Sequence, residues 1–389
     1  MNNFTFYVPT KVFFGKDTHK NVGEIVKSYG YKKIMLQYGK GSVKKNGVYD
    51  EVMTSLLKND IEVVEFGGVD PNPRLSKVRE AVELAKKENV EMILALGGGS
   101  TIDSSKYTAL GAVNDCDVWD IATKKETPKK ALPVGCILTI SAAGSEMSES
   151  AVVTNEELKM KIGFTSGLIR CKFAICNPEL TYTVNEYQTA CGVVDIMMHT
   201  IERYFNNCDP FEITDKISEG LLKAVINSGK VLMENPRDYD ARANIMWASS
   251  MSHNGLTEAG RARYLAVHQL EHALSGEDET ISHGAGLAVL FPKWARYVYK
   301  HNIPRFAQFA RNVWEVCEED DEKAALLGIE KLEEYFRFLK MPSSLAEFGI
   351  KKDVCGKLSE LCTYGKTRVI DGFCPLSYNE VKEIFEICC

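Results

Sequence analysis

Short apolar runs alternate with segments of helical periodicity through the first half of the chain. These runs lie at 33–38, 61–66, 91–96, 132–140 and 173–176, and helical patterns separate the first three of them. Strands that alternate with helices are typical of βαβ units, because parallel neighbours need a crossover between them. The pattern therefore predicts an α/β domain built on a parallel sheet.

The second half of the chain has a helical pattern throughout. From about residue 183 the apolar positions recur at helical spacing, as at 219–233, 241–253 and 329–339, with Pro and Gly mainly at the joints. We therefore expect an α/β domain over residues 1–183 and an all-α domain over residues 184–389. No low-complexity tract or Gly/Ser linker separates them, so the change of pattern alone sets the boundary.

Composition and charge narrow the classes of partner. The chain has 389 residues, of which 45% are hydrophobic and 26% charged, as in a soluble globular protein. The formal net charge is -6 and no long run of Lys or Arg occurs, so the electrostatic footprint of a nucleic-acid-binding protein is missing. We expect a small-molecule ligand, and neither a nucleic acid nor a membrane as partner.

The ends of the chain and its cysteines indicate the compartment. The first ten residues lack the basic start and the apolar stretch of a signal peptide, and no apolar run is long enough to span a bilayer. The 12 cysteines are scattered from Cys116 to Cys389 and include no CxxC pair, which favours free thiols. We therefore expect a cytoplasmic protein.

Three consecutive glycines follow the apolar run at 91–96. Gly97, Gly98 and Gly99 lead through Ser100 into a helical pattern. Glycines let the backbone approach an anion closely, and the first turn of a helix presents unpaired N–H groups. The segment matches neither the GxGxxG fingerprint nor a P-loop, and the alternative is a tight turn that needs flexible glycines. At the end of a strand we favour a pyrophosphate cradle.

Four side chains with metal-binding chemistry occur in two clusters. Asp195 and His199 stand four residues apart, as do His268 and His272, so each pair shares one face of a helix. Asp195, His199, His268 and His283 would together offer one carboxylate and three imidazoles, which suits Zn²⁺ or Fe²⁺. The alternative is a set of histidines that only pack and hydrogen-bond, but their clustering favours a metal site.

The remaining histidines carry weaker indications. His272 lies one turn beyond His268, so it either faces the reacting groups as a catalytic residue or supports the ligands from behind. His253 is undecided. His19 and His301 lie outside the cluster, and we expect both to face solvent.

Ordered motifs extend through nearly the whole chain. They comprise Pro9-Thr10 with Phe14-Gly15, YGKGSVKKNGVYD at 38–50, Pro71-Asn72-Pro73, GGGSTIDSSK at 97–106, LTISAAGSEMSE at 138–149, and the segments 192–199 and 268–284. In these motifs the sequence resembles the iron-containing, or group III, alcohol dehydrogenase family, and within it the butanol dehydrogenase branch.

This resemblance implies a fold, an assembly and a set of site residues. The fold is an N-terminal Rossmann-like domain followed by a helical domain, similar to dehydroquinate synthase, and the assembly is a homodimer or larger homo-oligomer. The implied metal ligands are Asp195, His199, His268 and His283. The implied cofactor contacts are Gly39, Gly41, Ser42, Asn72, Gly97, Gly98, Gly99, Ser100, Asp103, Thr139, Lys161 and Tyr182.

The sequence departs from the family pattern at three places. Lys40 stands where the branch usually has a third glycine, and Ala143 replaces a common Thr. The segment from His268 to His283 is one residue longer than usual, with acidic residues at 277–279. This leaves His283 as the ligand that the resemblance places least well.

The implied reaction is hydride transfer between NAD(P)(H) and a small primary alcohol or aldehyde such as butanol or butanal, with a cation that polarises the substrate oxygen. The alternative is a metal- and NAD-using lyase of the dehydroquinate synthase type. That chemistry needs basic residues to clamp a phosphorylated, carboxylated substrate. The helical half shows no concentrated Arg/Lys set beside the histidines, although Arg261, Arg263 and Lys293 are close in sequence. A metal hydrolase without nicotinamide would leave the glycine loop unexplained.

The end of the first predicted strand bears on the choice of cofactor. A carboxylate at such a position accepts hydrogen bonds from the ribose hydroxyls and repels an added 2′-phosphate, and Gln37-Tyr38-Gly39 carries none. Gly39 leaves room, Ser42 can donate a hydrogen bond, and nearby basic residues could face the phosphate: Lys40, Lys44 and Lys45. We therefore predict that NADP(H) is favoured over NAD(H). The alternative is that these lysines only decorate a solvated turn.

Overall fold

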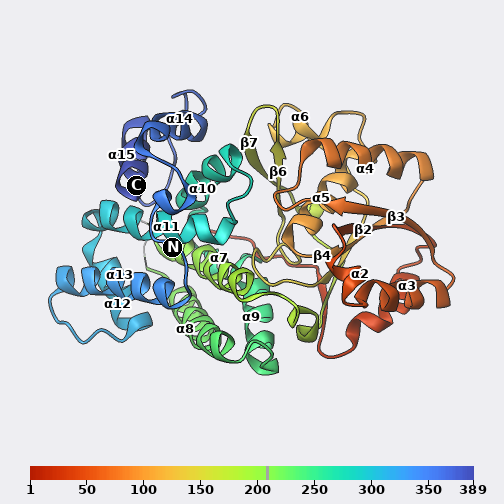
Figure 1. The fold of residues 1–389 in the computed structure, drawn as a ribbon, viewed down its shortest axis with the longest axis horizontal. Coiled ribbons are helices and arrows are strands. Elements are labelled where there is room, and N and C mark those ends of the chain that lie inside the picture. Colours follow the sequence, from red (N-terminus) through yellow and green to blue (C-terminus); the bar gives the residue numbers. More distant parts are fainter. Residues whose placement is uncertain (207–209) are drawn as a thin grey trace. The chain divides into compact units, whose positions relative to one another are not determined.

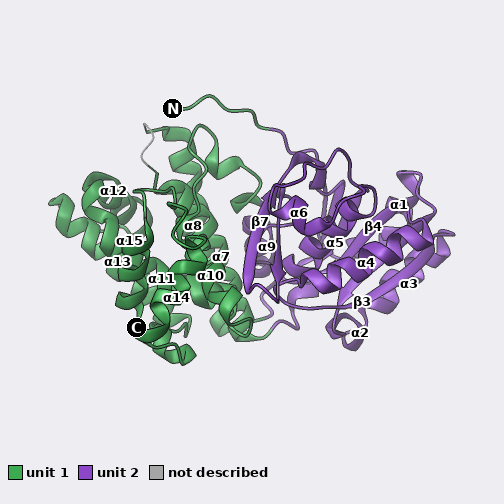
Figure 2. Cartoon of the chain, turned by 90° about the horizontal axis from the view of Figure 1, so that it is seen from above, with its two compact units in different colours: residues 1–6, 185–236, 251–389 green, residues 7–184, 237–250 purple. Residues whose placement is uncertain are grey.

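The computed structural model describes residues 1–206 and 210–389, which divide into two compact units. Figure 2 shows unit 2 as Tyr7–Val184 with Arg237–Ser250, and unit 1 as Met1–Phe6, Asn185–Pro236 and Met251–Cys389. The first six residues therefore belong to the helical unit. The segment at 237–250 belongs to the unit that contains the large sheet.

Unit 2 is built on a six-stranded sheet (Figure 1). Its strands are β1 (Lys11–Phe14), β2 (Lys33–Gly39), β3 (Glu62–Val69), β4 (Met92–Gly97), β5 (Val134–Leu138) and β8 (Phe173–Cys176). Their order is β1-β8-β5-β4-β2-β3, and every neighbouring pair is parallel. A separate antiparallel hairpin joins β6 (Ser150–Asn155) to β7 (Met160–Thr165).

Apolar side chains cover both faces of this sheet, because successive residues of a strand point to opposite sides. Ile34 and Leu36 lie in one core with residues of α1 (Val22–Ser28) and α3 (Val48–Lys58). Met35 and Ala95 lie in the other core, with residues of α4 (Leu75–Glu88) and α5 (Gly99–Gly111). The unit also contains the short helices α2 (Ser42–Lys45) and α6 (Val118–Ala122) and most of α9 (Tyr239–Ser252).

Unit 1 is helical in its described residues. Its helices are α7 (Glu186–Tyr204), α8 (Glu212–Glu234), α10 (Ala266–Glu277), α11 (His283–Val298), α12 (Ile303–Trp314), α13 (Asp321–Phe338), α14 (Lys352–Cys362) and α15 (Tyr378–Cys388). Asn185 caps α7 by accepting a hydrogen bond from the Gln188 amide at 2.8 Å. Every residue of α7 from Thr189 to Tyr204 is buried, as expected of a helix at the centre of its unit.

The predicted fold class is confirmed. The five apolar runs form β2, β3, β4, β5 and β8, and the three predicted helical segments fall in α8, α9 and α13. Strand β1 and the β6–β7 hairpin were not predicted. β1 is only four residues long and lies at the edge of the sheet, so its burial is incomplete and its hydrophobic pattern is weak. Among the described helices, none is long and apolar enough to cross a membrane.

Candidate metal centre and cofactor loops

Two glycine-containing loops follow neighbouring strands at the carboxyl edge of the sheet. Strands β2 and β4 pair as far as Tyr38 and Leu96, and the loops begin directly after this pair. The chain passes from β2 to β3 on one side and returns to β4 on the other, so the strand order reverses here. In open α/β sheets, ligands bind outside the carboxyl ends of the strands at such a point. The topology therefore brings the two expected cofactor loops together.

Helix α5 begins at the second of these loops. Gly98 is its N-cap and Gly99 its first residue. A Cβ at Gly98 would strike the side chain of Ile140, and a Cβ at Gly99 would lie 3.1 Å from that of Ala143. Packing therefore opposes a side chain strongly at Gly98 and more weakly at Gly99, as in the tight-turn interpretation. The first N–H groups of α5 nevertheless lack acceptors in a preceding turn, as an anion site needs.

Asp103 and Lys106 anchor the serine-rich segment that follows β5. The buried Asp103 carboxylate accepts hydrogen bonds from the Ser145 hydroxyl at 2.5 Å and from the Val152 amide at 2.9 Å. Burial raises the pKa of Asp103, although Lys106 opposes this shift. The fully buried Lys106 ammonium donates to the carbonyl and hydroxyl oxygens of Ser145 and Ser148 at 2.8–3.2 Å. Both carboxylate oxygens of Asp103 thus accept hydrogen bonds from protein groups, and these bonds hold the serine-rich segment in place.

Other expected cofactor residues lie on segments connected to this edge. The Thr139 amide donates to the Gly97 carbonyl at 3.0 Å, which places Thr139 against the glycine loop. Asn72 has a φ of 53°, and the next residue accepts a hydrogen bond from the Thr154 amide at 2.8 Å. Lys161 stands opposite Thr154 in the hairpin and is buried. Asn72 and Lys161 are therefore linked through one hairpin, while Tyr182 caps a short 3-10 helix at Pro178–Thr181.

The loop after β2 carries less free positive charge than the sequence suggests. Gly39 ends β2, Gly41 is the N-cap of α2 with a φ of 123°, and Ser42 is the first residue of α2. The exposed Lys40 ammonium forms an ion pair with Asp70. The Lys44 ammonium lies 3.5 Å from a carboxylate oxygen of Glu65 and over the rings of two tyrosines. Two of the three lysines thus have acidic partners.

Three helices of unit 1 bring the expected metal ligands to one point. Asp195 and His199 lie on α7, His268 lies on α10, and His283 is the first residue of α11, which packs on both other helices (Figure 1). The Nε2 atoms of His199, His268 and His283 lie 3.5, 3.6 and 3.7 Å from Oδ1 of Asp195. One carboxylate oxygen thus faces three imidazole nitrogens.

Two of these facing atoms have no hydrogen-bond partner within the described parts of the chain, residues 1–206 and 210–389. Oδ1 of Asp195 and Nε2 of His268 are both buried and unsatisfied. Leaving such atoms unpaired is costly, and a divalent cation between the carboxylate and the imidazoles would satisfy them together. The donor set of three nitrogens and one oxygen fits Fe²⁺ or Zn²⁺. The residues present therefore fit a resident cation.

Burial and neighbouring charges shift the pKa values of the two buried histidines, His199 and His268, in opposite directions. Burial lowers the pKa of His199 well below its usual value, and the cationic forms of His253 and His268 would lower it further. Burial also acts to lower the pKa of His268, but the carboxylates of Glu202 and Asp195 outweigh it and raise that pKa to about 9. A cation that binds at His268 must therefore displace a proton from its ring at neutral pH.

Residues that the sequence analysis missed contact the outer nitrogens of the ligands. Nδ1 of His268 hydrogen-bonds the Glu202 carboxylate, and Nδ1 of His283 hydrogen-bonds the Glu271 carboxylate. Nδ1 of His199 instead faces the Arg203 guanidinium at 3.4 Å. A signal for both glutamates was present, because Glu202 follows His199 by three residues and Glu271 follows His268 by three, which places each pair on one helix face.

The other histidines differ in their surroundings. His272 is partly buried, and its ring centroid lies 5.7 Å from that of His283. The undecided His253 lies beside the centre, with its ring centroid 4.0 Å from that of His199. The prediction that His19 faces solvent is wrong, because the residue is 2% exposed and its Nε2 lies 2.6 Å from a carboxylate oxygen of Glu51.

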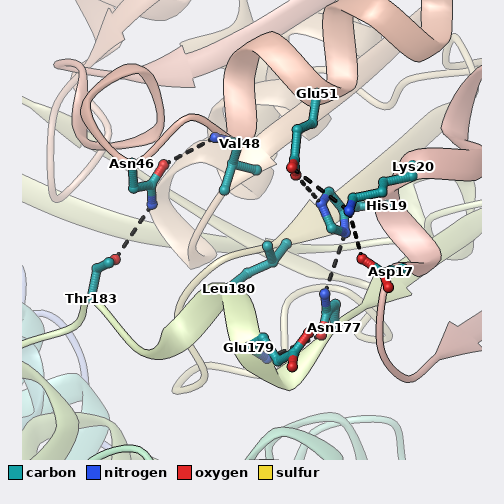
Figure 3. Close-up of a pocket in the computed structure, with 10 residues that line it drawn as sticks. All are labelled: Asp17, His19, Lys20, Asn46, Val48, Glu51, Asn177, Glu179, Leu180 and Thr183. Atoms are coloured by element: carbon teal, nitrogen blue, oxygen red, sulfur yellow. Dashed lines mark hydrogen bonds and ion pairs between the residues drawn. The ribbon is translucent and has the colours of Figure 1, made fainter.

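His19 lines a polar pocket of about 270 Å³ in unit 2 (Figure 3). Its ring lies between Glu51 and Asn177, whose amide nitrogen is 3.3 Å from Nδ1. The burial of His19 has no local sequence signal, because its partners lie 32 and 158 positions away. None of the residues that line this pocket is an expected site residue.

Comparison with protein families decides the assignment. A model described as "Iron-containing alcohol dehydrogenase" matches residues 9–178, and one described as "Fe-containing alcohol dehydrogenase family, C-terminal" matches residues 189–388. The chain belongs to the iron-containing alcohol dehydrogenase family. It is therefore an oxidoreductase that acts on CH–OH groups with a divalent metal and a nicotinamide cofactor, and the lyase alternative is not favoured.

Individual relatives confirm the resemblance to the butanol dehydrogenase branch. The NADH-dependent butanol dehydrogenase A of Clostridium acetobutylicum is 40% identical over 388 residues, with 99% of each chain covered. The NADPH-dependent aldehyde reductase of Escherichia coli is 34% identical over 373 residues, with 95% of each covered. The crystal structure of NADH-dependent butanol dehydrogenase A from Thermotoga maritima superposes with a TM-score of 0.96 at 41% identity, covering 100% of this chain and 99% of that one.

Proposed function

We propose that this protein interconverts a small aldehyde such as butanal and the corresponding primary alcohol at the centre formed by Asp195, His199, His268 and His283. The observation that carries the proposal is the convergence of three Nε2 atoms on one buried, unsatisfied carboxylate oxygen. Relatives named as butanol dehydrogenases and aldehyde reductases support the substrate class.

Each residue of the centre has a proposed task. The three imidazoles and the Asp195 carboxylate would hold Fe²⁺ or Zn²⁺. When bound, the cation supplies Lewis acidity toward the substrate oxygen, and the nicotinamide supplies or accepts the hydride. Aldehyde reduction also consumes a proton, and the partly exposed ring of His272 beside His283 is placed to deliver it. We therefore assign His272 as the catalytic acid and base.

The cofactor would lie at the carboxyl edge of the sheet in unit 2. The first turn of α5, with Gly97, Gly98, Gly99 and Ser100, would bind the pyrophosphate. Asp103 would hold the adjoining loop, and the remaining contacts would come from Gly39, Gly41, Ser42, Asn72, Thr139, Lys161 and Tyr182. The reversal of strand order between β2 and β4 supports this placement.

We further propose that NADP(H) is favoured over NAD(H). Gly39 brings no carboxylate to the end of β2, so nothing at that position repels a 2′-phosphate. The exposed Lys40 ammonium, held by Asp70, would be the nearest basic group. Curated relatives are named for either cofactor, so direct measurement decides this point.

Two further features complete the proposal. A homodimer or larger homo-oligomer is supported by the edge strand β1, whose last residue, Phe14, is 39% exposed. A cytoplasmic site of action is supported by the described cysteines, which are free thiols.

An activity screen tests the proposal directly. Protein loaded with Fe²⁺ or Zn²⁺ should oxidise NADPH or NADH in the presence of straight-chain aldehydes, followed by absorbance of the reduced cofactor. The Asp195→Asn variant, which removes the shared charge, serves as the matched control. Turnover of a phosphorylated sugar acid without net oxidation of the cofactor, and none of butanal, would contradict the proposal and favour a lyase.

A further inference from the structure

Two of the three histidines of the centre hydrogen-bond a carboxylate through Nδ1, and the two carboxylates come from different helices. Glu202 belongs to α7, the helix that also carries Asp195 and His199, and it also accepts hydrogen bonds from the Val267 and His268 amides at 2.5 and 3.2 Å. Glu271 belongs to α10 and reaches across to His283 on α11. Glu271 thus connects the ligand that the resemblance placed least well to the helix that carries His268.

The surroundings of Glu271 favour its hydrogen bond with His283. The residue is completely buried, and a buried carboxylate is costly unless it is paired and hydrogen-bonded. It accepts a hydrogen bond from Nδ1 of His283. That bond fixes the imidazole tautomer in which Nε2, the atom 3.7 Å from Asp195, carries the lone pair.

Two glycines on α11 make the contact sterically possible. A Cβ on Gly286 would lie 2.9 Å from Cγ of Glu271, so a side chain there would compete with the glutamate for the same space. A Cβ on Gly284 would strike the backbone carbonyl of Cys191 on α7. The start of α11 can therefore lie directly against α7, one turn before Asp195, and also beside Glu271.

We propose that Glu271 is a positioning residue that fixes the orientation of His283 and thereby sets the affinity of the centre for its cation. The inference rests on the proposed function, because it takes His283 as a ligand. It assigns Glu271 no contact with the substrate. Because Glu271 contacts His283, its removal should weaken cation binding more than it alters the affinity for aldehyde.

The test measures Zn²⁺ affinity, which does not depend on turnover. Wild type, Glu271→Ala and Glu271→Gln are titrated against a chromophoric chelator in competition. We expect Glu271→Ala to bind Zn²⁺ about 10- to 100-fold more weakly, the range found when partners of metal-bound histidines are removed. Glu271→Gln, whose amide oxygen can still accept from Nδ1, should lose less.

A matched control lies on the same helix. Glu277 on α10 pairs with Lys357 at 2.7 Å, so Glu277→Gln removes one carboxylate from the same helix while keeping the shape of the side chain. It should bind Zn²⁺ like wild type. Gly286→Ala provides a second perturbation, since it crowds the side chain of Glu271 while leaving both partners in place, and it should also weaken binding.

Spectra of the Co²⁺-loaded proteins report the geometry of the ligands. A change in the visible absorption of the Glu271→Ala protein, absent from Glu277→Gln, would support altered placement of His283. Equal Zn²⁺ affinity and equal Co²⁺ spectra in folded wild type and Glu271→Ala would overturn the inference while leaving the proposed function intact. Failure of wild type to bind any divalent cation would instead overturn the proposed function itself.

Discussion

The metal centre of unit 1 and the glycine loops of unit 2 are built on opposite principles. The centre consists of charged and polar side chains on three helices, of which Asp195, His199 and His268 are buried and His283 is partly exposed. The loops consist largely of positions where a side chain is absent, as at Gly98. A metal needs specific donor atoms, whereas a pyrophosphate needs access to backbone N–H groups.

This contrast determines what a substitution does in each region. At the centre, removal of one side chain changes the donor set and leaves other buried groups unpaired. At the loops, addition of a side chain changes the space and the backbone conformation. The centre should therefore respond mainly in cation binding and turnover, and the loops mainly in cofactor binding and stability.

Removal of a metal ligand should have the largest effect. In His268→Ala and Asp195→Asn the cation loses one donor, and we expect turnover to fall by about a thousandfold, because a Lewis acid contributes several kcal/mol to the transition state. Cation content should be measured beside activity. Substantial turnover by either variant in a metal-free preparation would show that these side chains do not serve as ligands of a catalytic cation.

Substitution at Gly98 separates packing from cofactor binding. Gly98→Ala should cost about 1–3 kcal/mol of unfolding free energy because its Cβ strikes Ile140. The double variant Gly98→Ala/Ile140→Ala should regain part of that stability. Cofactor affinity, measured by fluorescence titration, should stay weak in the double variant if the glycine serves pyrophosphate binding. Recovery of wild-type affinity would show that the loop needs the glycine only for packing.

A new charge at the loop after β2 should shift the choice of cofactor. Gly39→Asp places a carboxylate at the end of β2, and a Cβ there meets only the Val69 carbonyl, at 3.6 Å. We expect the ratio of kcat/KM with NADPH to kcat/KM with NADH to fall roughly 5- to 150-fold, which corresponds to on the order of 1–3 kcal/mol. Asp70→Asn, which frees Lys40, should move the ratio in the opposite direction. A wild type that already favours NADH would contradict the proposed preference.

An exposed ion pair of unit 2 should have the smallest effect. Arg79 binds Asp117 through two hydrogen bonds of 2.8 and 2.9 Å and thereby lowers the pKa of that carboxyl. A lowered folded-state pKa stabilises the fold above the unfolded pKa of about 3.9, and this contribution disappears as the pH falls through the folded value. Asp117→Asn should therefore cost less than about 1 kcal/mol at pH 7.

Denaturation across pH checks this last expectation. The difference in unfolding free energy between wild type and Asp117→Asn should shrink as the pH falls below about 4, where the carboxylate becomes protonated. A difference that stays constant down to pH 2 would show that the effect does not come from the charge of Asp117, because asparagine caps α6 as well as aspartate does. The Arg79–Asp117 pair would then contribute nothing to stability through its charge.

The amino-acid sequence by itself determined the features that depend on near neighbours. Apolar runs of four to nine residues identified five strands, and the spacing of Asp195 with His199 placed two ligands on one helix face. The glycines at 97–99 marked the turn between a strand and a helix. Each of these signals is local, because hydrophobic periodicity and turn chemistry act within a few residues.

Only the tertiary structure decided which distant groups meet. The contact of Glu202 with His268 spans 66 positions and that of His19 with Asn177 spans 158, so no local pattern could show that these side chains contact each other. Helix α9 has an ordinary helical pattern, yet residues 237–250 belong to the unit of the large sheet. Gly284 and Gly286 look unremarkable in the sequence because their importance comes from the atoms that face them. Burial and pairing depend on the whole fold, and they determine the pKa values of the buried histidines at the centre.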